Sequence, residues 1–138
     1  MNNFQLSILA SDRPFYEGEC VSLLVPTNDG IYGVQAHHHN IIAAIVAGTL
    51  SFKRAENSDF EYAAVSEGIM KVEDNKVLIL VDTAERPDEI DSKRAMLDAE
   101  EAKEEMLKNR SIAEYKEAQA RLARALTRLK TKGKMRIN

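Results

Sequence analysis

Charged residues near position 90 are the first that could bind a ligand. Asp91, Arg94 and Ala95 are spaced i, i+3 and i+4, so a helix would present them on one side. A guanidinium at such a place can hold a phosphate or a carboxylate. The same spacing also fits an ordinary intrahelical ion pair, which contributes only about 0.2–0.5 kcal/mol. The spacing alone leaves both interpretations open.

A second group of cations follows in the C-terminal part of the chain. Arg124 and Arg128 are four residues apart, and with Arg121 they form a stripe beside an apolar helix face. Charge-assisted hydrogen bonds from guanidinium groups favour phosphates and carboxylates. The stripe therefore predicts a surface for an anionic partner, and the alternative is a solvated helix face.

The charge of the chain is distributed unevenly. Residues 1–87 carry 6 basic and 12 acidic side chains, whereas residues 88–138 carry 13 basic and 10 acidic ones. No acid follows Glu117. The basic end is expected to meet an acidic surface, a phosphate-bearing ligand or nucleic acid. Nucleic acid is the weaker alternative, because the basic segment lacks interleaved aromatic residues for stacking and the first part of the chain is acidic.

Catalysis and metal binding are not predicted. The chain has no Gly-x-x-x-x-Gly-Lys loop, no Gly-x-Gly-x-x-Gly motif and no nucleophile with an evident His and acid. Histidines occupy positions 37–39, but alternate side chains of an extended segment point in opposite directions, and no second Cys or His cluster completes a metal shell. A single cysteine, Cys20, excludes an internal disulfide and is expected to be a buried thiol in a reducing compartment.

The part of the chain before position 82 has the pattern of short strands. Phe4, Leu6 and Ile8 alternate with polar residues, as in a half-buried strand. Tight turns are predicted at 27–30 and 73–76, where Asn, Asp and Gly tolerate positive φ angles. Further strands are expected at 15–26, 31–34, 48–53, 60–65, 68–72 and 77–81. The spacing predicts an antiparallel β-sandwich or a flattened barrel.

The composition changes to that of helices between Thr83 and Ala95. Pro87 suits a first helical position, and the acids that follow it suit a helix N-terminus. We therefore predict a sandwich domain over residues 1–84 and a helical domain over 85–138. No segment resembles a signal peptide or is apolar for long enough to span a bilayer.

Two amphipathic helices are predicted in the helical domain. The first has a stripe at Ala95, Ala99, Ala102 and Met106, made almost wholly of small side chains. A break is expected at 108–110, and Ser111 with Glu114 forms a capping box for the second helix. The apolar stripe of the second helix is Tyr115, Ala118, Leu122, Ala125 and Leu129. The helices should fold back as an antiparallel hairpin, and its mostly alanine contact should be only marginally stable.

Several short fragments, taken in order, resemble one known family. These fragments are Phe4, Tyr16-Glu17-Gly18-Glu19, Gly30-Ile31-Tyr32-Gly33-Val34, His38, Ala43-Ala44, Val65-Ser66-Glu67-Gly68, Asp74-Asn75-Lys76-Val77 and Asp82-Thr83-Ala84-Glu85-Arg86. Together with the helix pair that follows, they make the whole chain similar to the epsilon subunit of bacterial rotary ATP synthases. The resemblance implies a non-catalytic central-stalk subunit that couples the catalytic head to the c ring during ATP synthesis and ion transport.

The resemblance also implies a regulatory ATP site, with no metal required. Residues 90–95 look like the family's nucleotide motif of Ile or Leu, Asp, two variable residues, Arg and Ala. The ATP-binding residues that it implies are Glu85, Ile90, Asp91, Arg94, Ala95, Arg124 and Arg128. The arginines would meet the triphosphate, and Glu85 and Asp91 would serve the adenine and ribose side. Glu101 stands where some members of the family have a further arginine.

Finally, the resemblance implies partners and a location. Residues Asn28, Asp29, Gly30, Ile31 and Tyr32 would face the c ring, and His38 would face the gamma subunit. In an extended state of the helices, Arg121, Arg124, Arg128 and Lys130 would contact the catalytic alpha and beta subunits and inhibit ATP hydrolysis. The family works at the cytoplasmic face of the bacterial membrane, as a peripheral subunit. The alternative is a stand-alone β-sandwich adaptor whose basic helices bind nucleic acid or an acidic protein.

Overall fold

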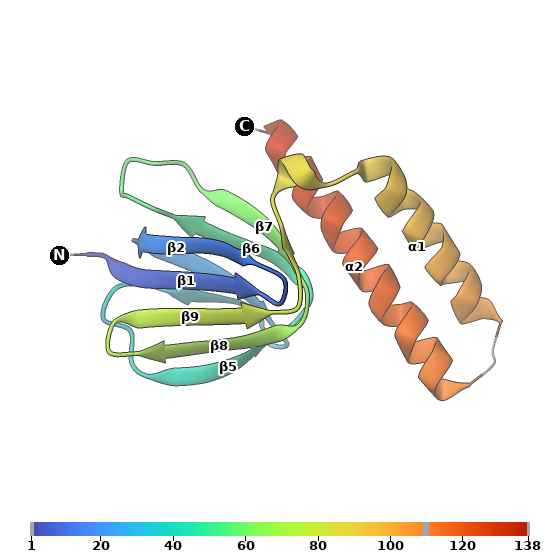
Figure 1. The fold of residues 1–138 in the computed structure, drawn as a ribbon, viewed down its shortest axis with the longest axis horizontal. Helices are drawn as coiled ribbons and strands as arrows, with labels where there is room; N and C mark the ends of the chain where they lie inside the picture. Colours follow the sequence, from blue (N-terminus) through green and yellow to red (C-terminus); the bar gives the residue numbers. More distant parts are fainter. Residues whose placement is uncertain (1, 109–110, 138) are drawn as a thin grey trace.

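The computed structural model describes residues 2–108 and 111–137 and shows two parts (Figure 1). The first part is a β-sandwich, and the second is an antiparallel pair of helices, α1 (Ser92–Leu107) and α2 (Ile112–Ile137). The helix pair lies beside one end of the sandwich, with α2 between α1 and the strands (Figure 1). The predicted α+β class, with an N-terminal sandwich and a C-terminal hairpin, is confirmed.

In the described part of the chain, each layer of the sandwich is a sheet of five strands. The first sheet has the order β2 (Pro14–Cys20), β1 (Phe4–Ala10), β9 (Lys76–Val81), β8 (Gly68–Glu73), β5 (Ile41–Ile45). The second has the order β10 (Ala84–Glu85), β7 (Glu61–Val65), β6 (Gly48–Lys53), β3 (Ser22–Thr27), β4 (Gly30–Val34). Neighbouring strands are antiparallel except β1 and β9, which pair in parallel and were not predicted to pair.

The core lies between the two sheets and follows the predicted alternation. Leu6 and Ile8 of β1 are fully buried, as are Leu23 of β3 and Phe52 of β6 from the opposite sheet. The Cys20 thiol is also fully buried, as predicted, and burial raises its pKa. The sandwich is therefore a complete hydrophobic core without any contribution from the helices.

Both predicted tight turns are present. The turn between β3 and β4 is closed by Thr27, whose Oγ1 donates to the Gly30 carbonyl at 2.7 Å, and Gly30 has a φ of 108°. The turn between β8 and β9 places Asp74 and Asn75 at φ angles of 49° and 62°, the left-handed geometry that suits the twist of a two-residue hairpin. Asn and Asp tolerate this geometry, so the sequence sets the register of β8 and β9.

The first helix starts later than predicted. Pro87 begins only a short 3-10 helix (η1, Pro87–Glu89), and Ile90 is extended and buried. Helix α1 begins at Ser92 because Asp91 is its N-cap and accepts a hydrogen bond from the Arg94 amide at 3.2 Å. The predicted helix start at Pro87 is therefore wrong by about one turn.

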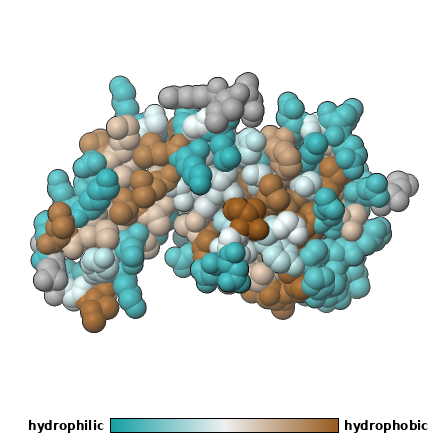
Figure 2. All heavy atoms as spheres, turned by 180° about the vertical axis from the view of Figure 1, so that it is seen from behind, coloured by the Kyte–Doolittle hydropathy of each residue, from teal (hydrophilic) through white to brown (hydrophobic). Residues whose placement is uncertain are grey.

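The two helices pack largely through small side chains. Ala95, Ala99 and Ala102 of α1 are buried, and so are Ala118 and Ala125 of α2. The other members of the predicted stripe differ: Leu122 and Leu129 are half-buried, and Tyr115 is 43% exposed. Tyr115 was thus wrongly predicted to be part of the packed face. Figure 2 shows a band of apolar atoms along the helix pair, flanked by hydrophilic side chains.

The ends of the helices agree with the predicted break. Helix α1 ends at Leu107, and α2 begins at Ile112 with the Glu114 amide donating to Ser111 Oγ at 3.1 Å. This bond is the predicted cap. Positions 109 and 110 of the predicted break lie outside the described residues.

Helix α2 is also attached to the sandwich. Thr131 is fully buried, and its Oγ1 lies 2.7 Å from Thr49 Oγ1 on β6. Lys132 Nζ donates to the Pro87 carbonyl at 3.1 Å, and Lys134 lies over the Tyr62 ring. These contacts add to the alanine contact with α1, so helix–helix packing alone does not determine how firmly the pair is held.

Candidate functional site

A polar cavity lies where β10, η1, α1 and α2 meet. Its volume is about 350 Å³, within the usual range for ligand sites. The lining residues are Glu85, Glu89, Asp91, Arg94, Ala95, Asp98 and Arg128. The fold therefore brings together residues from the strand that ends the sandwich, from the start of α1 and from the C-terminal half of α2.

Asp91 and Arg94 meet in this cavity, but not as a simple ion pair. The Asp91 carboxylate caps α1 through the Arg94 backbone amide, so one carboxylate oxygen is committed to the helix. The Arg94 side chain is exposed at the cavity wall. Within the described residues, the contact between the two is this capping bond, which replaces the ion pair considered from the sequence.

Arg128 joins three elements at the centre of the cavity. Its Nε donates to Glu85 Oε1 on β10 at 2.6 Å, and its Nη1 lies 3.7 Å from Asp98 Oδ2 on α1. The Arg128, Glu85 and Asp98 side chains are 33%, 25% and 35% exposed, so solvent only partly screens these pairs. One guanidinium from α2 thus holds the sandwich edge and the first helix together.

The remaining residues predicted to bind ATP lie nearby or are buried. Arg124 is exposed and lines a small neighbouring hollow together with Glu85 and Arg128. Arg121, which was predicted to contact a partner, lies further along α2 and pairs with Glu101 of α1 at 3.6 Å. Ile90 is 4% exposed and is not among the residues that line the cavity. The structure therefore brings five of the seven predicted residues to one cavity.

Two cavity residues were missed by the sequence analysis. Asp98 is four residues after Arg94 and three after Ala95, so helical spacing alone places it on the same side. Glu89 accepts from Arg13 Nη2 at 2.7 Å and from the Arg86 amide at 3.1 Å. The hydrogen bond from Arg13 is the main reason that the pKa of Glu89 lies below its usual value. No local pattern connects Arg13 to Glu89, because they are 76 positions apart.

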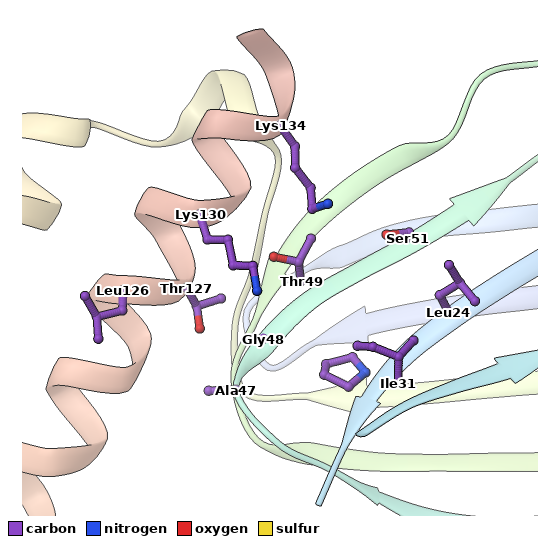
Figure 3. Close-up of a pocket in the computed structure, with 11 residues that line it drawn as sticks. Leu24, Ile31, Ala47, Gly48, Thr49, Ser51, Leu126, Thr127, Lys130 and Lys134 are labelled. Atoms are coloured by element: carbon purple, nitrogen blue, oxygen red, sulfur yellow. The ribbon is translucent and has the colours of Figure 1, made fainter. Parts of the chain in front are cut away.

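A second hollow separates α2 from the second sheet (Figure 3). Its volume is about 460 Å³. Leu24 and Ile31 form part of its wall on the strands, and Lys130 and Lys134 project from α2 toward the sheet (Figure 3). Leu126 of α2 also lines the hollow. Lys130, predicted to contact a partner, lies here and not in the polar cavity.

The predicted partner-binding tip is exposed. Asn28, Asp29 and Gly30 form the turn between β3 and β4, and the next side chain, Ile31, is 63% exposed. Tyr32 points back and its hydroxyl lies 2.9 Å from His38 Nε2. The predicted tip is thus a tight turn followed by one large exposed apolar side chain.

Hydrogen bonds hold the loop that contains the histidines at positions 37–39. His37 has a φ of 62°, and its amide donates to Asn75 Oδ1 at 2.7 Å. His38 Nδ1 lies 2.7 Å from the His39 carbonyl, so this nitrogen carries the proton, and Nε2 accepts from the Tyr32 hydroxyl. The loop is therefore ordered, and both nitrogens of His38 have partners.

An apolar row crosses the outer face of the first sheet. The register places Ala44 of β5 opposite Ile69 of β8, and Ile69 opposite Leu80 of β9. Ile69 and Leu80 are 44% and 42% exposed, and Ile42 on the same face of β5 is 67% exposed. The outer face of the first sheet therefore exposes several apolar side chains to solvent.

The described part of the chain contains neither a cluster of potential metal ligands nor a membrane-spanning helix. Within residues 2–108 and 111–137, no three His, Cys, Asp or Glu side chains are grouped so that they could hold a metal ion. Neither α1 nor the described part of α2 is long and apolar enough to cross a membrane.

Comparison with known proteins gives matches along nearly the whole chain. Residues 3–87 match the model of the ATP synthase delta/epsilon chain beta-sandwich domain, and residues 88–133 match that of the ATP synthase delta/epsilon chain long alpha-helix domain. An ATP synthase epsilon chain from Ruminiclostridium cellulolyticum is 38% identical over 99% of this chain and 100% of its own length. One from Caldanaerobacter subterraneus is 39% identical over 95% of this chain and 94% of its own.

Solved structures show the same fold at lower identity. A chain in the mitochondrial ATP synthase of Euglena gracilis superposes with a TM-score of 0.78 at 20% identity, over 96% of this chain and 80% of that one. A chain in the central stalk and c-ring structure of the Tetrahymena thermophila mitochondrial ATP synthase superposes with a TM-score of 0.62 at 15% identity. The match covers 93% of this chain and 95% of that one. The arrangement of sandwich and helix pair is therefore shared well beyond the bacterial relatives.

Proposed function

The chain belongs to the delta/epsilon chain family of ATP synthases, and we propose that it is the epsilon subunit of the central stalk of a bacterial F-type enzyme. In this role it is a non-catalytic rotor subunit that couples the catalytic head to the c ring. The observation that carries the proposal is the match of both parts of the chain to this family, together with a relative named ATP synthase epsilon chain that aligns over its whole length.

The sandwich, residues 1–84, is proposed as the docking part. The exposed apolar row of Ala44, Ile69 and Leu80, together with Ile42 on the same face, is suited to bind the gamma subunit. Burying these side chains removes apolar surface from water. The tip at Asn28–Tyr32 is proposed to contact the c ring, and the His38 loop to contribute to the gamma interface. The subunit would then lie at the cytoplasmic face of the membrane through its partners alone.

The polar cavity is proposed to bind ATP as a regulatory ligand. Arg94 and Arg128 supply cations for the phosphates, with Arg124 next to them. Glu85 and Asp91 supply acceptors for the ribose hydroxyls and the adenine amino group. The residues therefore fit the ligand in chemical type, and the cavity lies between the two helices, where a bound ligand would favour the closed hairpin.

The helices, residues 85–138, are proposed as the regulatory part. In the closed hairpin they leave ATP hydrolysis free. In an extended state they would place Arg121, Arg124, Arg128 and Lys130 against acidic segments of the beta subunits and hinder rotation. A ligand at about 100 times its dissociation constant stabilises the state that it binds by roughly 2.7 kcal/mol, which is enough to shift such a balance.

The assembled catalytic head tests this proposal. Reconstitution with the full chain should give lower ATPase activity at low ATP than reconstitution with a chain that ends at Pro87. The sandwich core contains no helical residue, so the shortened chain should still assemble. Equal ATPase activity with both chains, at every ATP concentration, would leave only a structural role for the subunit.

The ligand part has its own test in the purified subunit. Asp91→Ser keeps the α1 cap, because Ser is as good an N-cap as Asp, but removes the carboxylate from the cavity. We expect ATP binding, measured by calorimetry, to weaken in Asp91→Ser and in Arg94→Gln while circular dichroism stays unchanged. Unchanged binding in both variants would remove these residues from the site.

A further inference from the structure

We infer that two carboxylates of α1, Asp98 and Glu101, hold the helical hairpin closed without nucleotide by pairing with Arg128 and Arg121 of α2. Asp98, which lines the polar cavity with Arg128, must in addition be displaced from this arginine when phosphates bind there. The closing role stands on the structure alone, whereas the competition with phosphates rests on the proposed function.

The two ion pairs form a ladder along the helix pair. Arg128 lies 3.7 Å from Asp98, and Arg121 lies 3.6 Å from Glu101. Arg121 and Arg128 are seven residues apart, so they share one side of α2, and Asp98 and Glu101 share one side of α1. Each pair crosses from one helix to the other, so both are lost when the hairpin opens.

Arg128 is partly occupied by carboxylates in the closed state. Its Nε donates to Glu85 at 2.6 Å while its Nη1 faces Asp98, so two of the three guanidinium nitrogens lie against carboxylates. The bond to Glu85 is short and the contact with Asp98 is long, so Asp98 is the partner that an incoming phosphate displaces more readily.

The charge of the cavity supports the same view. Four of its lining residues are carboxylates, at positions 85, 89, 91 and 98, and two are arginines, Arg94 and Arg128. The wall is thus net negative, and a triphosphate must overcome repulsion from Asp98 to reach Arg128. The ion pair between Arg128 and Asp98, which helps to hold the hairpin closed, therefore also lowers the affinity of the cavity for nucleotide.

The test is amide hydrogen exchange of helix α1 in the full chain, without nucleotide and with added ATP. The variant Asp98→Asn/Glu101→Gln removes both carboxylates with little change of shape. The matched control Glu100→Gln/Glu104→Gln removes two charges from the exposed side of the same helix; Glu100 pairs with Lys103 of α1 itself. Exchange in residues 92–107 reports how often the helix leaves its packed state.

Without nucleotide, exchange across residues 92–107 should become about 10-fold faster in Asp98→Asn/Glu101→Gln, as expected for the loss of two partly exposed ion pairs, and should stay unchanged in the control. Exchange as slow as in the parent protein would overturn the closing role. Equal acceleration in the control would overturn it as well, because general charge would then be the cause.

Added ATP separates this inference from the proposed function. ATP should slow exchange by a larger factor in Asp98→Asn/Glu101→Gln than in the parent protein, because the Asp98 carboxylate no longer competes for Arg128. An equal factor in both proteins would overturn the competition. If ATP slows exchange in neither protein while the variant still exchanges faster, the closing role holds and the proposed nucleotide site is the part that fails.

Discussion

At the scale of single residues, the same side chain often has one task in the fold and another in the proposed function. Asp91 is the clearest example, because its carboxylate caps α1 and also lines the cavity. Arg128 likewise holds β10 and α1 while it supplies a cation to the cavity. Substitutions at such residues change stability and binding together, so tests need variants that separate the two effects.

Glu89 gives a prediction about pH. Its pKa lies below the usual value because Arg13 and the Arg86 amide donate to the ionised carboxylate. The stabilisation is therefore fully present above the unfolded pKa, near 4.5, and is lost as the pH falls through the lower folded value. In thermal unfolding followed by circular dichroism, Glu89→Gln should melt a few degrees below the parent protein at pH 7.

At pH 3.5 the melting temperatures of Glu89→Gln and the parent protein should approach each other. Acid protonates Glu89 in the parent protein and so removes the charge that the substitution removes at pH 7. Arg13→Gln serves as the matched control, since it deletes the other member of the pair and should show the same convergence. A difference in melting temperature that stays constant across this range would contradict the assignment.

At the scale of elements, Gly68, the first residue of β8, is the glycine at which an added Cβ would come closest to other atoms. A Cβ at Gly68 would lie 2.0 Å from the Leu80 carbonyl oxygen and 2.8 Å from the Val81 Cα, and backbone atoms cannot yield as a side chain can. We expect Gly68→Ala to lower the free energy of unfolding by at least about 2 kcal/mol, measured in urea.

Gly133 provides the opposite control in the same chain. It lies within α2, and a Cβ added there would meet no atom within 4 Å, so Gly133→Ala should stabilise the helix by about 0.5–1 kcal/mol. If Gly68→Ala and Gly133→Ala changed the free energy of unfolding in the same direction, the close contact at Gly68 would not explain the effect of Gly68→Ala.

At the scale of the whole molecule, the apolar row on the first sheet is a surface that the fold itself leaves uncovered. Ile69 and Leu80 lie side by side and do not contribute to the core. We predict that Ile69→Ser/Leu80→Ser weakens binding of the purified gamma subunit by about 10-fold or more for each side chain. Surface plasmon resonance with immobilised gamma subunit measures this loss.

The control for that experiment is Leu97→Ser on α1. The Leu97 side chain is 63% exposed and lies outside the first sheet. It should leave binding of the gamma subunit unchanged. Retained binding in Ile69→Ser/Leu80→Ser, with an intact fold by circular dichroism, would show that the gamma subunit docks on another face.

The sequence predicted the local features of this protein well. The alternation of Phe4, Leu6 and Ile8, the hairpin of β8 and β9, and the cap at Ser111 are all present. Strand β5 was not predicted, because its apolar run has no clear alternation, and the start of α1 was placed too early because the buried Ile90 interrupts the helix after η1.

What the sequence determined by itself is therefore most of the elements and the family, since periodicity, turns and caps depend on residues only a few positions apart. The tertiary structure alone decided that β1 pairs in parallel with β9, that Arg128 reaches Glu85 across 43 positions, and that Asp98 joins them. These contacts depend on how α2 is rotated and where it rests on the sandwich. Long-range packing sets that placement, and no local pattern in the chain encodes it.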